Sequence, residues 1–101
     1  MIIITINKLK LMEVFVLSYS SIIKGESTTT IEGVYSSSNQ VNQVIDKIIT
    51  DIENEYKNMF KLDICKYNGG VENDCPCAYI RELNEVPELE IDLQSDKFIV
   101  Q

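Results

Sequence analysis

The sequence has 101 residues and a formal net charge of −7, with nine Lys and Arg against 16 Asp and Glu. A hydrophobic content of 45% with 25% charged residues is typical of one globular domain and excludes an intrinsically disordered chain. The sequence has no His, the commonest general base, and one Arg, too few for a surface that reads nucleic acid. We therefore expect a non-enzymatic protein with no cofactor and no direct contact with nucleic acid.

The N-terminal residues 1–11 are expected to form an extension or an additional edge strand, ahead of a single α+β domain over residues 12–101. An ordered strand is favoured, because the Ile-rich run Met1–Ile6 would promote aggregation if it were exposed. The positive charges follow this run rather than precede it, unlike those of a signal peptide. No apolar run approaches the roughly 20 residues of a membrane span. We expect a cytoplasmic protein that does not contact a membrane.

Two strands are predicted next in the chain. Residues 13–20 carry apolar side chains on both faces, which indicates a central strand whose Phe15, Leu17 and Tyr19 face either the helix or the far side. Residues 28–35 are rich in β-branched and aromatic side chains. Because residues 24–27 read as a turn, the two strands are expected to form an antiparallel hairpin.

A helix is predicted over residues 38–60. Its apolar residues recur at steps of three and four and make one stripe: Val41, Val44, Ile45, Ile48, Ile49, Ile52, Tyr56, Met59 and Phe60. Ser37 with Gln40 fits a capping box at its start. Because the stripe contains many β-branched residues, burial against a sheet must hold this helix, rather than intrinsic propensity.

The second half of the chain is predicted to contain a loop over residues 67–76 and strands over 77–83 and 88–93, with a last short edge strand over 97–100. The fold class is therefore α+β, a four- to five-stranded antiparallel sheet packed on one long helix. The element order is β-β-α-β-β, with a further N-terminal strand if Met1–Ile6 is ordered. One helix covers one face of a sheet, so an apolar far face would be buried by formation of a homodimer.

A resemblance follows from the first half of the chain. Residues 14–19, 33–37 and 41–49 resemble the strand, serine cap and amphipathic helix of small uncharacterised ββαβ proteins of phages and mobile elements of low-GC bacteria. The likeness covers about residues 12–49 and implies a ββαβ-type core in a protein that acts inside a host cell. It brings no catalytic residues with it.

Three cysteines are weak candidates for chemistry. Cys65, Cys75 and Cys77 could bind a soft metal or Zn²⁺, or form a cross-strand disulfide. Zn²⁺ would need Glu72 or Asp74 as its fourth ligand, and the Cys-Pro-Cys spacing differs from that of a zinc knuckle. The ordinary interpretation is that Cys65 is a small buried residue on a strand and that the other two flank a turn.

Acidic residues are concentrated at the C-terminal end. Residues 71–101 contain eight acids and two bases, and Glu88, Glu90 and Asp92 are spaced to project from one face of a strand. Such a row can attract a basic partner, or it can be a solvated face that keeps the protein soluble. Tyr67 and Tyr79 flank this region and could be aromatic anchors of an interface or ordinary packing residues. The candidate partner-binding residues are Glu82, Glu85, Glu88, Glu90, Asp92 and Tyr79.

The function predicted is that of a small acidic interaction protein, encoded by a phage or mobile element, that binds and inhibits a host protein. Its sharpest version is an anti-defence inhibitor, such as an anti-CRISPR protein, whose acidic face occupies the basic groove of a nucleic-acid-binding enzyme. Two alternatives remain. One is a small ligand- or metal-binding module or enzyme that uses the region of Cys65, Cys75 and Cys77, and the other is a self-assembling structural or regulatory phage protein.

Overall fold

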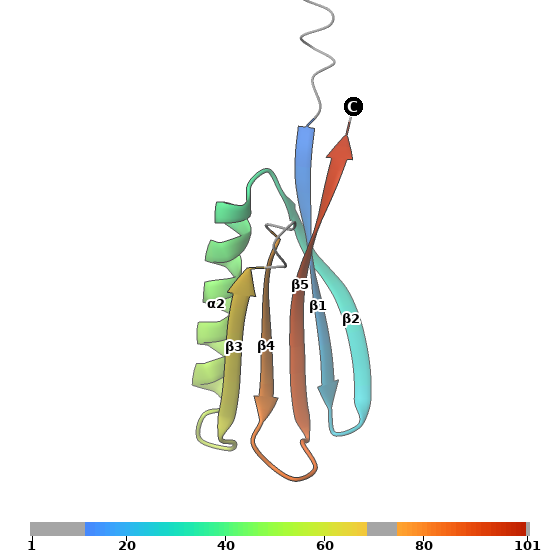
Figure 1. The fold of residues 1–101 in the computed structure, drawn as a ribbon. Coiled ribbons are helices and arrows are strands. Elements are labelled where there is room, and N and C mark those ends of the chain that lie inside the picture. The colour runs from blue at the N-terminus through green and yellow to red at the C-terminus, as the bar shows by residue number, and fades with distance from the viewer. Residues whose placement is uncertain (1–11, 69–74, 101) are drawn as a thin grey trace, which may run out of the picture.

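The computed structural model describes residues 12–68 and 75–100, which form a five-stranded antiparallel sheet packed on one helix (Figure 1). The sheet order is β2-β1-β5-β4-β3, so the C-terminal strand lies in the centre beside β1. This confirms the α+β class. The predicted strand at Met1–Ile6 lies outside the described residues.

The predicted hairpin is confirmed as β1, Met12–Ile23, and β2, Glu26–Tyr35. The turn between them has two residues, Lys24 and Gly25, with φ values of 53° and 84°. Positive φ at both central positions is what a tight type I′ hairpin turn requires. A register shift between Leu17 and Ser18 marks a β-bulge in this pairing, and bulges of this kind increase the local twist of a hairpin.

The helix α2 spans Ser38–Tyr56 and begins as predicted. The Ser37 hydroxyl accepts a hydrogen bond from the Gln40 backbone N–H, 3.2 Å away, while the Gln40 side chain accepts one from the Ser36 N–H at 3.0 Å. The prediction of a long helix that reaches residue 60 was wrong, because α2 ends at Tyr56 after 19 residues. The N–H groups of Met59 and Phe60 both donate to the Tyr56 carbonyl, which turns the chain toward the next strand.

No strand range was predicted over β3, Leu62–Asn68, although Cys65 was expected to lie on a strand; β3 follows the helix directly. It pairs with β4, Pro76–Glu82, so part of the predicted loop over 67–76 belongs to these two strands. The predicted strands over 88–93 and 97–100 are one continuous strand, β5, Leu89–Val100, which pairs with β1 along its whole length. The element order is therefore β-β-α-β-β-β rather than the predicted β-β-α-β-β.

The core lies between α2 and one face of the sheet. Phe15 and Leu17 of β1 are buried there, and Tyr19 packs against them, so all three face the helix. The other buried apolar residues come from α2, β4 and β5 and include Val41, Ile45, Ile52, Ala78, Ile80, Leu89, Ile91 and Leu93. Among the described residues, no helix is long and apolar enough to cross a membrane. The opposite face of the sheet, here called the outer face, has no helix over it within residues 12–68 and 75–100.

Candidate functional site on the outer face of the sheet

The outer face carries an acidic row along β5. Leu89, Ile91 and Leu93 are buried against the helix, so the alternate positions Glu90, Asp92 and Asp96 project from the outer face. Alternate residues of a strand lie roughly 6.6–6.8 Å apart. We define Glu90, Asp92 and Asp96 as the acidic row.

Hydroxyl groups surround the middle of the acidic row. Register places Asp92 opposite Ser20 of β1 and Tyr79 of β4. The Ser20 and Thr29 hydroxyls lie 3.1 Å apart on the neighbouring strands. A shallow pocket of about 340 Å³ opens over these residues and is also lined by Ser21, Ile22, Ser27, Glu90 and Ile91. The carboxylates of Glu90 and Asp92 therefore lie beside neutral hydrogen-bonding groups.

The charges on this part of the face are unbalanced. Arg81 lies opposite Glu90 in the register, but its Nε lies 3.5 Å from the Asp63 carboxylate on β3. Among the described residues, Asp92 has no cation within ion-pair distance; its Oδ2 accepts a hydrogen bond from the Gln94 amide at 3.3 Å. Over the described strand positions, Asp63 and the acidic row together give four carboxylates against one guanidinium. This half of the outer face is electronegative.

Partial burial affects the titration of two side chains here. Loss of hydration raises the pKa of the Asp92 carboxyl. Burial, followed by the negative charge of Glu90, raises the pKa of the Tyr79 hydroxyl. The ionised form of Asp92 is therefore less favourable in the folded protein than in the unfolded chain. A cation from a partner would relieve that cost.

Replacing Asp92 with Asn is expected to raise the free energy of unfolding at neutral pH, by up to about 0.5 kcal/mol, the scale typical of surface substitutions. In the wild type, the folded-state pKa is raised above its ordinary value of 3.8. The folded state therefore binds more protons in the interval between the two pKa values, and stability falls as the pH rises through it. The advantage of Asn over Asp should shrink as the pH falls through this interval and below it. Urea titrations of both proteins at several pH values would measure it, and an advantage that grows on acidification would contradict the assignment.

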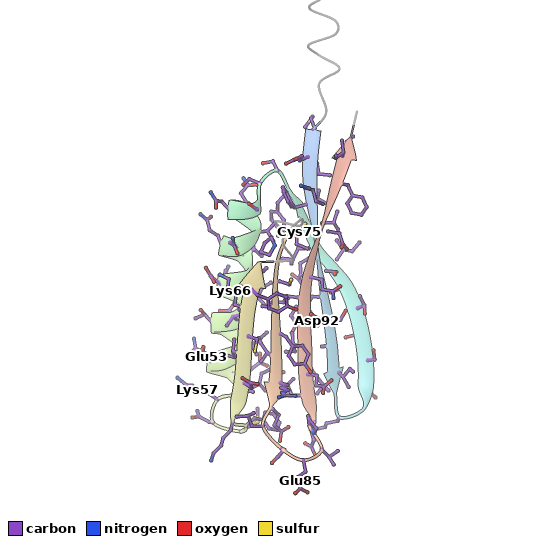
Figure 2. All side chains as sticks on the ribbon, viewed as in Figure 1. Glu53, Lys57, Lys66, Cys75, Glu85 and Asp92 are labelled. Atoms are coloured by element: carbon purple, nitrogen blue, oxygen red, sulfur yellow. The ribbon has the colours of Figure 1, made fainter. Side chains whose placement is uncertain are left out.

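The remaining predicted partner-binding residues lie elsewhere. Glu82 is 3% exposed and faces the helix side, where its carboxylate accepts hydrogen bonds from the Glu88 N–H at 2.9 Å and from the Asn84 amide. Glu85 and Glu88 are exposed in the loop between β4 and β5, and Figure 2 shows Glu85 at the end of the sheet, away from Asp92. Glu90, Asp92 and Tyr79 are thus brought together, whereas Glu82, Glu85 and Glu88 are not.

Asp63 and Asp96 belong to the electronegative half and were not predicted. Asp63 lies on the unpredicted strand β3, and Asp96 lies in the polar run that interrupted the predicted C-terminal strands. Extending the alternation of Leu89–Leu93 by three further residues would have placed Asp96 on the same face as Glu90 and Asp92.

The cysteines do not form a metal site in the described part of the chain. Cys65 is exposed on β3 and Cys77 is half-buried on β4, whereas Cys75 is buried, so the predicted burial of Cys65 was wrong. Cys65 lies opposite Tyr79, and Tyr67 lies opposite Cys77, which places the two outer thiols on a diagonal. Diagonal positions are typically about 7–8 Å apart, longer than a disulfide spans. Within the described residues, no three His, Cys, Asp or Glu side chains are grouped to hold a metal ion. Glu72 and Asp74 lie outside the described residues.

Comparison with family models, curated proteins and solved structures gives no match to this chain.

Proposed function

We propose that the protein is a small acidic interaction protein that binds a basic surface of another protein through the electronegative half of its outer face. The observation that carries this proposal is the half-buried Asp92, which lies in a shallow pocket without a cationic partner among the described residues. A Lys or Arg side chain would supply the missing charge. Glu90 and Asp96 lie on either side of Asp92 and extend the negative field along the strand.

Two tyrosines add contact area beside the acidic row. Tyr79 lies next to Asp92 and Tyr67 is 51% exposed on the neighbouring strand. Tyrosine is enriched at interfaces because it combines a large apolar ring with a hydrogen-bonding hydroxyl. A surface of carboxylates, hydroxyls and phenol rings suits a basic protein and repels the phosphates of nucleic acid.

The more specific form of the proposal is a phage- or mobile-element-encoded inhibitor of a host nucleic-acid-binding enzyme, in the manner of an anti-defence or anti-CRISPR protein. The acidic row would occupy a basic groove in which the enzyme otherwise holds phosphates. The small size, the charge of −7 and the absence of His support an inhibitor that acts by occupying a surface rather than by catalysis. The first half of the chain supports the same origin through its resemblance to small phage proteins.

Charge reversal of the acidic row tests the proposal. Glu90→Lys, Asp92→Lys and Asp96→Lys are combined in one variant and compared with Asp51→Lys, Glu53→Lys and Glu55→Lys, which make the same change of charge at exposed positions of α2. Circular dichroism must show that both remain folded. The wild type and the helix variant should capture a basic nucleic-acid-binding protein from a bacterial lysate. The row variant should capture at least tenfold less of that protein.

Competition identifies the surface that the captured protein uses. Added duplex DNA should release the protein from the wild type, since both ligands require the same basic groove. Equal capture by the row variant and the wild type would overturn the proposal. Capture that duplex DNA leaves unchanged would overturn the more specific form of it.

A further inference from the structure

The other half of the outer face is an apolar patch on β1, β2 and β5. The register pairs Val14 with Phe98 and Met12 with Val100 across β1 and β5, and Val16 with Val34 across β1 and β2. The patch comprises Met12, Val14, Val16, Ile31, Val34, Phe98 and Val100. Asp96, opposite Val16, lies at its boundary with the acidic row.

The exposed area of this patch is in the range of the largest apolar patch on a typical monomer. Ile31 is 69% exposed, Met12 and Val34 are 62% exposed, Phe98 is 52% exposed and Val100 is 46% exposed. At roughly 150–200 Å² for a whole large side chain, these five expose about 500 Å² together. Contiguous apolar patches of roughly 300–600 Å² are the largest that a typical monomer carries, and such patches are often interaction sites.

The sheet is also incomplete beside the patch. Among the described residues, β2 pairs with β1 only from Phe15 onward, and β4 pairs with β5 only as far as Gln94. The ends of β1 and β5 therefore form a two-stranded ribbon, which extends beyond α2 in Figure 1. An isolated pair of strands is marginally stable in water unless another layer packs on it.

We propose that a second copy of this chain packs on the apolar patch, face to face, to form a two-fold symmetric dimer. A stable interface buries roughly 800 Å² per partner. The five most exposed side chains supply more than half of that, and Val14 and Val16 with their backbone add to it. A second copy matches the patch because a two-fold axis places the same apolar surface on both sides.

The distribution of charge favours this arrangement between two chains of charge −7. Among the described residues, Asp96 is the only ionisable residue of the patch and its boundary, whereas Glu90, Asp92 and Asp63 lie toward the opposite end of the sheet. An antiparallel face-to-face packing sends the two electronegative halves in opposite directions. The dimer therefore avoids most of the like-charge repulsion, and it leaves Asp92 of both copies exposed to a partner.

Sedimentation and light scattering measure the oligomeric state directly. One chain has a mass of 11.5 kDa, so a dimer has twice that, 23 kDa. Val34→Asp with Phe98→Asp should give monomers, because each substitution places carboxylates in an apolar interface. The matched control, Leu83→Asp with Val86→Asp, changes two exposed apolar residues of the β4–β5 loop and should leave the dimer intact.

A milder variant tests the interface even if Val34→Asp with Phe98→Asp unfolds the protein. Val34→Ala with Phe98→Ala shortens two exposed side chains without adding charge, and we expect it to weaken dimerisation at least tenfold with an unchanged circular dichroism spectrum. A wild-type chain that is monomeric up to about 1 mM, where binding is worth only about 4 kcal/mol, would overturn the proposal. That result would assign the patch to residues 1–11 of the chain or to a different protein. Equal dimerisation of the patch variants and the loop control would also overturn it.

Discussion

Replacing Ile45 with Asp is expected to unfold the protein. Ile45 is completely buried in the middle of α2, where it packs with the core residues of the sheet. The substitution removes roughly 1.5–3 kcal/mol of apolar burial and places a carboxylate where the surrounding core residues are apolar. An unpaired buried charge costs several kcal/mol more. The total is comparable with the whole stability of a small domain, about 5–15 kcal/mol.

Gln43→Asp is the matched control for this substitution. Gln43 lies on the exposed side of the same helix. Its replacement by Asp adds the same carboxylate as Ile45→Asp does, but at a position exposed to water. Thermal melting followed by circular dichroism should show no cooperative transition for Ile45→Asp and a transition close to that of the wild type for Gln43→Asp. A cooperative transition near the wild-type temperature for Ile45→Asp would place Ile45 outside the core.

The parts of the fold that were predicted correctly are those encoded by neighbouring residues. The hairpin of β1 and β2 follows from two apolar runs around a Lys-Gly turn, and the start of α2 follows from Ser37 and Gln40. These signals act within ten or twenty residues of sequence. Local patterns therefore defined the first half of the molecule well.

The errors arose where distant parts of the chain decide the structure. β5 pairs with β1 from Met12 to Ile23, about eighty residues away in sequence, and that pairing carries the strand through the polar residues 94–97. β3 has a mixed sequence and is held by its pairing with β4. The helix was extended to residue 60 because Phe60 continues the apolar stripe, yet Phe60 packs on the Tyr56 ring from outside the helix, with ring centroids 6.1 Å apart.

In the candidate site, too, local sequence patterns place some residues correctly and fail for others. Strict alternation from Leu89 to Leu93 is sufficient to place Glu90 and Asp92 together on the face opposite the core. Hydropathy could not place Glu82 correctly. Its carboxylate lies on the core face of β4, in line with Ala78 and Ile80, at a position where an apolar residue is expected. Its location depends on hydrogen bonds to the loop that follows it.

Glu82→Ala is expected to lower the free energy of unfolding by about 1.5–3 kcal/mol, the usual cost of losing hydrogen bonds to a charged group. In a domain of this size the melting temperature should fall by roughly 6–24 °C. The Glu82 carboxylate accepts hydrogen bonds from the Glu88 N–H and the Asn84 amide, and the Glu88 carbonyl accepts one from the Lys24 N–H at 2.8 Å. Glu82 therefore joins the β4–β5 loop to the β1–β2 turn. Removing the Glu82 carboxylate takes away the acceptor of the Glu88 N–H and the Asn84 amide at this end of the sheet.

Glu85→Ala and Glu82→Gln separate this role from a general effect of acidic residues. Glu85 is exposed in the same loop, so its loss should change stability by no more than about 0.5 kcal/mol. Glutamine retains an oxygen that can accept from the Glu88 N–H, so Glu82→Gln should fall between the wild type and Glu82→Ala. Urea denaturation of the four proteins gives this order directly. If Glu82→Ala and Glu85→Ala were equally stable, Glu82 would not hold the loop. Because its buried position removes Glu82 from any partner-binding surface, the loss of stability in Glu82→Ala should occur without any loss of binding through Asp92.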